Sequence, residues 1–480
     1  MKSAVRRRWW TGAVLAGLLP LLTGMTAPGV LADETGPPTT RSQATVTSAR
    51  EDGTWRIEPV MGAVENVENL RSVPQGKGAS GPQQLVQEAR ERSDHAYADT
   101  SKVDLTQEGA KAEALAPPSQ LGQKPPSKKT KQCLAKQTSN TVWGETYDRW
   151  MWCQKYRIGF KYYLKVNNRD VYKGSVSLAY NMVTVGHGKT RTARTYFQAR
   201  QGSVAYDDWN LVDRYATAPY LNFSVIAECI QDAKYCQTVR GAAEHTWEDW
   251  DVHKEWKYWD TYSHEEASTA KDKVLFHQWH LRWKGGGNGY HGPDGTTAER
   301  TIRCDSANYF QSFGVRYPKA CVNYDVVPRL TYRISDARVR GVARHIRTAQ
   351  NEPTKTYPIE FDPKVIPGKF TGTRDDRGLR RVPDNGVESK ANEDIKKTAC
   401  ERKAPYEGWR GLPPFNTKTH DCDEYPFAST AEGAASWDWA FSVRAVPYSE
   451  NRAAGALLTW YYFSDRILYG QDEFWVQIRD

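Results

Sequence analysis

A period-two alternation of polar and apolar residues runs through the middle of the chain and limits what it can fold into. It is clearest in KYRIGFKYYLKV (155–166), GSVSLAYNMVTV (174–185) and VLFHQWHLRW (274–283), and turn residues such as NNRD and GGGNG separate such runs. Alternation interrupted by turns is typical of antiparallel strands. The sequence therefore predicts a central antiparallel all-β domain over residues 132–352, built as a sandwich or a barrel.

The amino-terminal residues have the pattern of an export signal. Arg6, Arg7 and Arg8 precede an apolar stretch over residues 11–31, and Ala32 ends a small-residue cleavage site. A membrane anchor is the alternative, but prolines and a glycine interrupt the apolar stretch. We expect a cleaved signal peptide over residues 1–32, a secreted extracellular protein and no stable membrane anchor after cleavage.

The segment that follows, residues 33–131, is rich in Pro, Gln, Ser, Lys and Glu and has little periodic apolar pattern. Such a composition buries too little apolar surface to offset the entropy lost on ordering. We expect a flexible linker or a pro-segment.

The cysteine content agrees with export. The chain has eight cysteines, an even number that favours four disulfides in an exported protein. Connectivity does not follow from the count, because many pairings are open. We favour pairing between sequence neighbours, which gives Cys133–Cys153, Cys229–Cys236, Cys304–Cys321 and Cys400–Cys422.

The β-rich domain carries a Trp-rich stretch, EHTWEDWDVHKEWKYWD (244–260). These aromatic side chains either form a sugar-binding platform or pack as a core face. The first option leaves open a non-enzymatic extracellular protein that binds carbohydrate or a cell surface. The histidines of this domain show no firm ligand spacing, so the sequence predicts no metal site there.

The last part of the chain has a different pattern. Residues 353–399 are rich in Pro, Gly and charge and predict a loop-rich lead-in. Over residues 400–480 the order strand, strand, helix, strand is expected, with the helix in SENRAAGALLTWYYFSDR (449–466) capped by Ser449. Gly455 inside this helix costs about 1 kcal/mol relative to Ala, which predicts a close approach of the hairpin that carries Asp423.

Four segments of this part, CDEYPFAS, EG, VPYSENRAAG and DEFWVQI, resemble the NucA/NucB family of secreted deoxyribonucleases. The resemblance covers about residues 400–480. It implies a small α+β domain with a ββα-metal-like core and a metal-dependent, non-specific endonuclease activity on DNA. Carried over by position, Asp423 is the general base and Asn451 the metal ligand, while Glu424 and Glu432 match acidic positions of the same segments.

The implied chemistry suits these residues. Phosphodiester hydrolysis needs an activated water, neutralisation of charge on the phosphoryl oxygens and help for the leaving oxygen, and a divalent cation supplies the last two. Mg²⁺ or Mn²⁺ takes oxygen ligands and keeps several waters. The amide of Asn451 with a carboxylate from Glu424 or Glu432 would then suffice. A Cys400–Cys422 disulfide would fix the backbone beside Asp423.

Charge adds candidates for DNA contact. Residues 401–480 hold eight Lys and Arg against twelve Asp and Glu, a net charge of −4, so this unit repels a polyanion without help. Arg452 and Arg444 are placed to contact the scissile phosphate, and Arg338 and Arg344 to contact phosphates further away. The oligomeric state is not predicted.

Asp423, Glu424 and Asn451 also have possible structural roles that need no catalytic function. Adjacent acids such as Asp423 and Glu424 are commonly a solvated pair, and an asparagine at a helix start is commonly only a cap. A glycosidase is disfavoured, because adjacent residues on an extended segment point to opposite faces, whereas glycosidase carboxylates must flank one bond.

Overall fold

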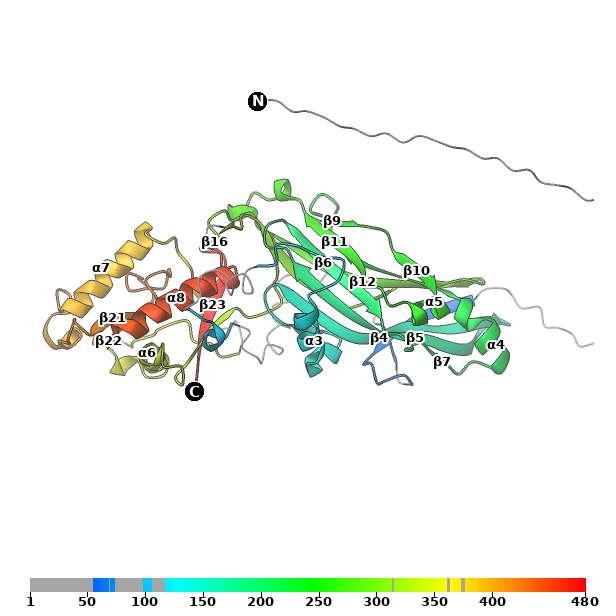
Figure 1. Cartoon of the computed structure of the whole chain (residues 1–480), viewed down its shortest axis with the longest axis horizontal. Helices are drawn as coiled ribbons and strands as arrows, with labels where there is room; N and C mark the ends of the chain where they lie inside the picture. Colours follow the sequence, from blue (N-terminus) through cyan, green and yellow to red (C-terminus); the bar gives the residue numbers. More distant parts are fainter. Residues whose placement is uncertain are drawn as a thin grey trace, which may run out of the picture. The chain divides into compact units, whose positions relative to one another are not determined.

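The computed structural model describes residues 55–68, 70–73, 98–105, 117–312, 315–360, 363–372 and 376–480. The predicted signal peptide lies outside these residues. The described residues form one compact unit, in which a β-rich region is followed by a mixed C-terminal region (Figure 1). Among the described residues, no helix combines the length and the apolar character that crossing a membrane would require.

The larger sheet of the β-rich region has the strand order β13-β1-β4-β5-β6-β11-β9. Its centre is the long antiparallel pair β4 and β5, which the alternating segments predicted. Three short strands pair with this path from the side: β2 with β1, β3 with β4 and β7 with β5. The strands are β1 (Trp55–Gly62), β2 (Arg71–Ser72), β3 (Glu145–Thr146), β4 (Met151–Val166), β5 (Arg169–Gly186), β6 (Thr192–Ala199), β7 (Ala205–Asp207), β9 (Cys236–Val239), β11 (Lys257–Ser263) and β13 (Tyr290–His291).

A second sheet has the order β10-β8-β12-β15-β18 and packs on the first. Its strands are β8 (Asn222–Cys229), β10 (Ala243–Thr246), β12 (Leu275–Gly286), β14 (Gly295–Thr296), β15 (Arg300–Asp305) and β18 (Ala320–Asn323), and a separate ladder joins β16 (Gln311–Ser312) to β17 (Val315–Arg316). Both sheets contribute to one buried cluster, and Trp283 Nε1 donates to the Gly159 carbonyl of the opposite sheet at 3.2 Å. The predicted antiparallel β region is therefore confirmed and is a sandwich.

The Trp-rich stretch belongs to the core of this sandwich. Trp247 and Trp250, in α5 (Trp247–Val252), and Trp259 in β11 are at most 1% exposed. The indole N–H of Trp247 donates to the Tyr162 hydroxyl at 2.9 Å. These side chains stabilise the fold and do not form an exposed sugar platform. The other short helices of this region are α3 (Ser127–Leu134) and α4 (Leu211–Ala216).

Part of the segment expected to be a linker is folded. Strand β1 runs antiparallel to β4 along its whole length, and Ile57 and Val60 are buried in the core. Asp99 accepts hydrogen bonds from Arg333 at 2.8 and 2.6 Å. The linker prediction is wrong for these residues, because their partners lie far along the chain and local composition does not reveal them.

In its described residues, the C-terminal region contains three α-helices and three strand pairs. Strand β23 (Glu473–Arg479) runs parallel to β19 (Arg329–Arg333) and antiparallel to β20 (Leu379–Arg380), and β21 (His420–Tyr425) pairs with β22 (Ser442–Pro447). The helices are α6 (Arg340–Asn351), α7 (Val387–Glu401) and α8 (Tyr448–Ser464). The expected order of strand, strand, helix, strand is present. Helix α8 starts one residue before Ser449, with Pro447 at the N-cap position, so the predicted cap is wrong.

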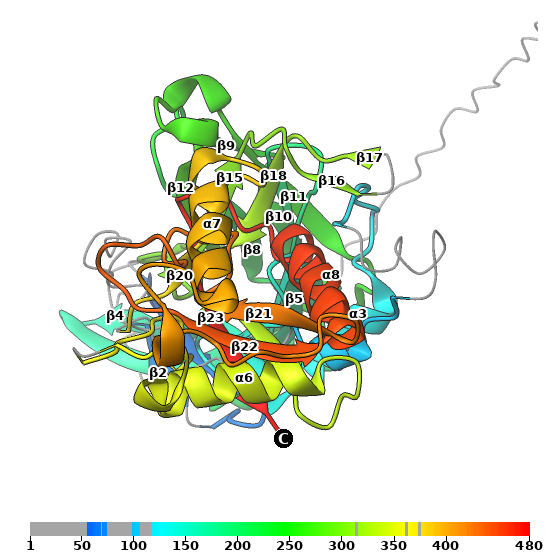
Figure 2. The same cartoon turned by 90° about the vertical axis from the view of Figure 1, so that its left-hand side faces the viewer.

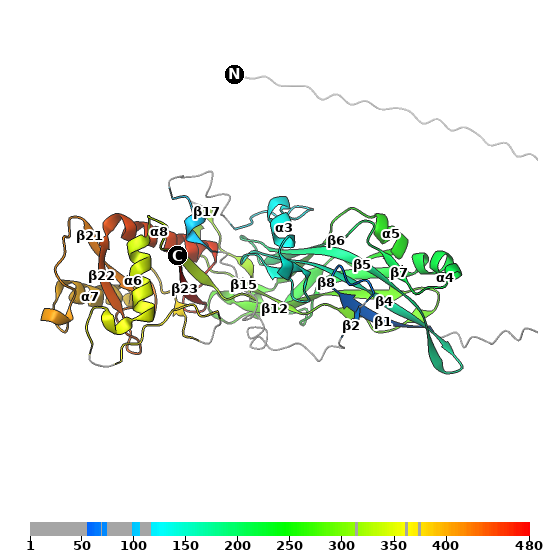
Figure 3. The same ribbon diagram turned by 90° about the horizontal axis from the view of Figure 1, so that it is seen from below.

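The packing of this region starts earlier than the sequence suggested. Leu330 of β19 and Ile346 of α6 share a hydrophobic cluster with Leu457 of α8, although both were assigned to the β-rich domain. Helix α7 occupies the last part of the segment 353–399, which was expected to be a loop-rich lead-in. The β21–β22 hairpin lies between α6 and the helices α7 and α8 (Figure 2), and Figure 3 shows α6 beside β22.

All eight cysteines form disulfides, and the pairing is the predicted one between sequence neighbours: Cys133–Cys153, Cys229–Cys236, Cys304–Cys321 and Cys400–Cys422. The last of these joins the end of α7 to β21, one residue before Asp423.

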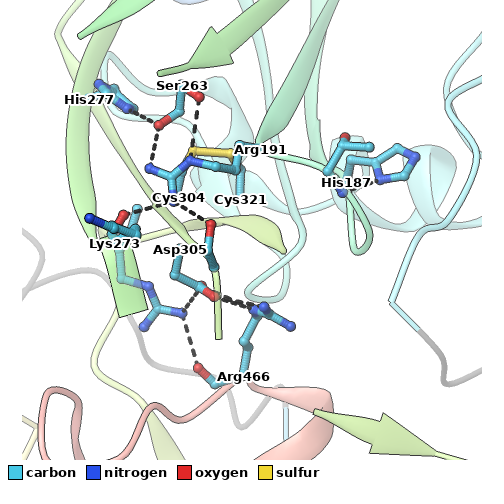
Figure 4. Close-up of a disulfide and its surroundings, with 12 residues drawn as sticks. His187, Arg191, Ser263, Lys273, His277, Cys304, Asp305, Cys321 and Arg466 are labelled. Atoms are coloured by element: carbon cyan, nitrogen blue, oxygen red, sulfur yellow. Dashed lines mark hydrogen bonds and ion pairs between the residues drawn. A yellow bond between two sulfur atoms is a disulfide. The ribbon is translucent and has the colours of Figure 1, made fainter. Parts of the chain in front are cut away.

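Buried ion pairs join the sandwich to the C-terminal region. Arg466 Nη2 lies 2.7 Å from Asp305 Oδ1, beside the Cys304–Cys321 disulfide (Figure 4). Arg303 is paired with Asp472 and Asp305. These four side chains are at most 5% exposed, so breaking one pair would leave an uncompensated buried charge.

Candidate active site

The β21–β22 hairpin sends its two adjacent acids in opposite directions. Successive side chains of a strand point to opposite faces, so Asp423 faces α6 and Glu424 faces α7. The same alternation puts Ser442 on the α6 face, because Ser442 pairs with Tyr425, two residues after Asp423. The sequence predicted this divergence.

Asp423 is buried and bonded to a histidine. Its Oδ2 lies 2.6 Å from His345 Nδ1, and His345 Nε2 lies 2.7 Å from Ser442 Oγ. Sequence reasoning missed His345, which lies in α6 and is 1% exposed. A signal was present: His345 falls among Val342, Ala343, Ile346 and Ala349 on the buried face of the helix, where a polar ring needs a partner.

Glu424 is paired with a lysine on the other face of the hairpin. Its Oε2 lies 3.1 Å from Lys396 Nζ, and the same ammonium group also contacts Glu393. Burial raises the pKa of Glu424 to about 7, and the nearby charges of Asp423 and Glu393 act in the same direction while Lys396 opposes them. The Glu424 carboxyl can therefore bind or release a proton near neutral pH.

A cleft of about 320 Å³ brings the principal predicted residues together. Asp423, Glu424 and Asn451 all line it, with Lys396 and Gly455. A second hollow of about 750 Å³ is also lined by Asn451 and Lys396, so the two hollows share residues of α8 and α7. Asp423 of β21 and Asn451 of α8 thus line one cleft despite their separation in sequence.

The chemistry of this cleft fits a hard divalent cation. Its lining includes four carboxylates, from Asp384, Glu393, Asp423 and Glu424, with the Asn451 amide and the single ammonium group of Lys396. Oxygen donors with excess negative charge are what Mg²⁺ and Mn²⁺ bind, with water completing the coordination. Among the described residues, three potential His, Cys, Asp or Glu ligands come within 4.8 Å of one another only at Cys229, Cys236 and His277. Those two cysteines form a disulfide, so that group does not hold a metal.

Most of the residues that line this cleft lie in a part of the chain that is similar to a known protein family. Residues 374–477 match the family model described as Deoxyribonuclease NucA/NucB. The C-terminal region is therefore similar to NucA/NucB deoxyribonucleases. The match includes Asp423, Glu424 and Asn451 and confirms the resemblance drawn from the sequence. No curated protein matches the chain, and no solved structure matches it.

Glu432 lies within the residues that match the family model but does not line the cleft. Its buried carboxylate accepts the Arg380 backbone N–H at 2.7 Å and the Arg380 and Arg377 side chains at 2.9 and 3.1 Å. The expectation that Glu432 binds metal does not agree with this placement, because its charge is already compensated by two arginines. It fixes β20 instead.

The arginines proposed for DNA contact have different surroundings. Arg338 is bound internally, to Asp336 and to the carbonyls of Val103 and Thr100, which leaves little of its guanidinium for phosphate. Arg344 on α6 and Arg444 on β22 are exposed. Arg452 does not line the cleft; its side chain is 72% exposed, with Nε 3.7 Å from Asp421 Oδ2.

Gly455 faces open space. Apart from its chain neighbours and the backbone of its own helix, a Cβ built at this position would meet no heavy atom within 4 Å, so the predicted close approach of the hairpin is wrong. The residue lines the cleft, where the missing side chain leaves room.

Proposed function

We propose that the protein is a secreted, metal-dependent endonuclease that hydrolyses phosphodiester bonds of DNA without base specificity. The observation that carries the proposal is the convergence of Asp423, Glu424 and Asn451 on one cleft within the residues that match the NucA/NucB family model. The family match supports a deoxyribonuclease, and the donor set of the cleft supports metal dependence.

The residues of the cleft take separate roles in this proposal. Asp423 accepts the proton of the attacking water as general base. Asn451, with a carboxylate of the cleft, would hold Mg²⁺ or Mn²⁺, which when bound neutralises charge on the phosphoryl oxygens and stabilises the leaving oxygen. Glu424, with its pKa raised to about 7, stores a proton beside the cleft. Lys396 attracts the phosphate electrostatically.

Exposed arginines support binding without base specificity. Arg344, Arg444 and Arg452 present guanidinium groups at the surface of the domain. Contacts to phosphate position DNA and carry no sequence information. Replacing Arg344 and Arg444 by Ala should weaken binding to all sequences alike and flatten its salt dependence.

Secretion rests on two observations. The amino-terminal pattern is that of a cleaved signal, and all eight cysteines are paired. Disulfides persist mainly in oxidising compartments.

The direct test is cleavage of supercoiled plasmid by the purified protein with Mg²⁺ or Mn²⁺, with and without chelator. We expect Asp423→Asn to lower the rate by about 10²- to 10⁴-fold, the range for a lost general base. Asp438→Asn is the matched control, because Asp438 is exposed in the loop between β21 and β22 and should leave the rate unchanged. Intact plasmid with the wild-type protein and either metal would overturn the proposal and favour a binding function.

A further inference from the structure

We propose that His345 is a positioning residue for Asp423, and that the hydrogen-bonded chain Ser442–His345–Asp423 orients the carboxylate in the cleft. This inference rests on the proposed function, since it assigns a role to a residue that acts through the candidate general base. His345 does not line the cleft and is not itself a catalytic residue.

The geometry of the ring carries the proposal. Asp423 lies on β21 and Ser442 on β22, both on the face of the hairpin that α6 covers, so the imidazole bridges two strands. Both ring nitrogens are engaged, at 2.6 and 2.7 Å, and the side chain is 1% exposed. The ring cannot rotate without breaking two buried hydrogen bonds, which makes it a rigid support.

The direction of the hydrogen bonds follows from the donors available. An ionised carboxylate only accepts, so His345 Nδ1–H donates to Asp423 Oδ2. In the neutral ring Nε2 then accepts the Ser442 hydroxyl proton. Among the described residues no donor is bonded to Asp423 Oδ1. The bond to His345 therefore holds one carboxylate oxygen and leaves the other for a water in the cleft.

Helix α6 also connects the two sides of the cleft. Its Gly341 N–H donates to the carboxylate of Glu450 in α8, the helix that carries Asn451. Tyr332, in the preceding strand β19, donates its hydroxyl proton to the Ala454 carbonyl of α8 at 2.8 Å. Helix α6 thus fixes Asp423 through His345 and is itself fixed to the helix of Asn451. It lies outside residues 374–477, so the site depends on chain that precedes the family match.

The test compares His345→Ala with His345→Asn, because an Asn amide reaches the position of Nδ1 and keeps a donor for Asp423. We expect His345→Ala to lower kcat for plasmid cleavage about 100-fold, the cost of a misplaced catalytic group, with KM for DNA changed less than about twofold. His345→Asn should recover at least tenfold of that loss. Mn²⁺ affinity, measured calorimetrically without DNA, should stay within about twofold in both variants.

His277→Asn is the matched control, since His277 is equally buried but lies in the sandwich. It should leave kcat unchanged. If His345→Ala does not fold, Ser442→Ala replaces it, with an expected loss in kcat of about tenfold at unchanged KM.

Three results would overturn the inference: an unchanged kcat in His345→Ala, no recovery in His345→Asn, or a parallel loss of kcat, DNA affinity and Mn²⁺ affinity, which marks a general structural role. Its failure is distinguishable from failure of the proposed function. If only the inference fails, the wild-type protein cleaves plasmid and Asp423→Asn does not, whatever the His345 variants do. If the proposed function fails, the wild-type protein itself leaves the plasmid intact.

Discussion

The sandwich and the C-terminal region each bury a histidine between two polar side chains, and the two histidines differ in their partners. In the sandwich, His277 has Nε2 2.7 Å from Ser263 Oγ and Nδ1 3.0 Å from the Gln231 amide oxygen. In the C-terminal region, His345 has a serine at the same nitrogen but a carboxylate at the other.

The surroundings of His277 are those of a structural residue. Burial lowers its pKa to about 4, and the charge of Arg191 adds to the effect. Arg191 also donates to Ser263 Oγ at 2.8 Å, in the polar network beside the Cys304–Cys321 disulfide (Figure 4). His277 is enclosed by neutral or cationic groups, whereas His345 holds an acid that reaches a cleft. The charge and exposure of the partner, and not burial of the ring, separate the two roles.

The largest expected effect concerns the junction of the two regions. Asp305→Asn would leave the buried guanidinium of Arg466 without its carboxylate, at a cost of about 3–5 kcal/mol in unfolding free energy. Denaturant unfolding measures this loss, and activity per folded molecule should be unchanged. Asp480→Asn, at the exposed pair with Arg347, should cost at most about 1 kcal/mol. Equal costs for the two variants would contradict a special role for the buried junction.

The pH dependence of stability tests the raised pKa of Glu424. Because the pKa of Glu424 is raised from 4.5 to about 7, the folded state holds this proton where the unfolded state has lost it. Stability should fall as pH rises from about 4.5 to about 7, by about 3 kcal/mol. Glu424→Gln should lack this fall. Its melting temperature, measured in the presence of chelator, should therefore rise relative to that of the wild type as the pH increases from 5 to 8.

Glu393→Gln is the control for that comparison, because Glu393 contacts the same lysine but its side chain is 54% exposed. It should show nearly the same fall in stability, slightly smaller because the charge of Glu393 adds to the raised pKa of Glu424. A constant difference between Glu424→Gln and the wild type across this pH range would refute the assigned shift.

A smaller effect separates the two histidines directly. Ser442→Ala and Ser263→Ala each remove a buried hydroxyl bonded to a histidine, and each should cost about 1–3 kcal/mol in unfolding free energy. Only Ser442→Ala should also lower kcat. An equal fall in kcat for both serines would remove the distinction between the regions.

The smallest effect is expected at Gly455. Because a Cβ there meets no neighbour, Gly455→Ala should stabilise α8 by about 1 kcal/mol, visible as a higher melting temperature. If DNA occupies the cleft, the added methyl group should raise KM slightly. A lower melting temperature would show that the glycine serves the fold.

The sequence predicted the elements whose evidence is local. Alternation located β4, β5 and β12, and the apolar spacing of residues 454–462 located α8. It did not predict α7, because the buried residues of that helix are Ser389, Asn392 and Ala399, which form no apolar stripe. It also placed β19 and α6 in the wrong region, because their partner strand and helix follow more than 100 residues later.

The same division applies to the candidate site. Asp423, Glu424 and Asn451 were found because contiguous motifs carry them. His345 and Lys396 were missed, since each reaches the hairpin from a separate helix, and such a contact leaves no spacing in the sequence. Glu432 was assigned to metal because its motif was recognised without the arginines that neutralise it.

The disulfides bear on how such a chain reaches its native state. Each bond joins cysteines only 7 to 22 residues apart, so the loops that must close are short and their entropic cost is small. Every correct partner emerges during synthesis soon after the first cysteine and before the next pair. Oxidation in order of emergence therefore yields the native connectivity without reshuffling. The sandwich and the C-terminal region can then pack against each other after their disulfides have formed.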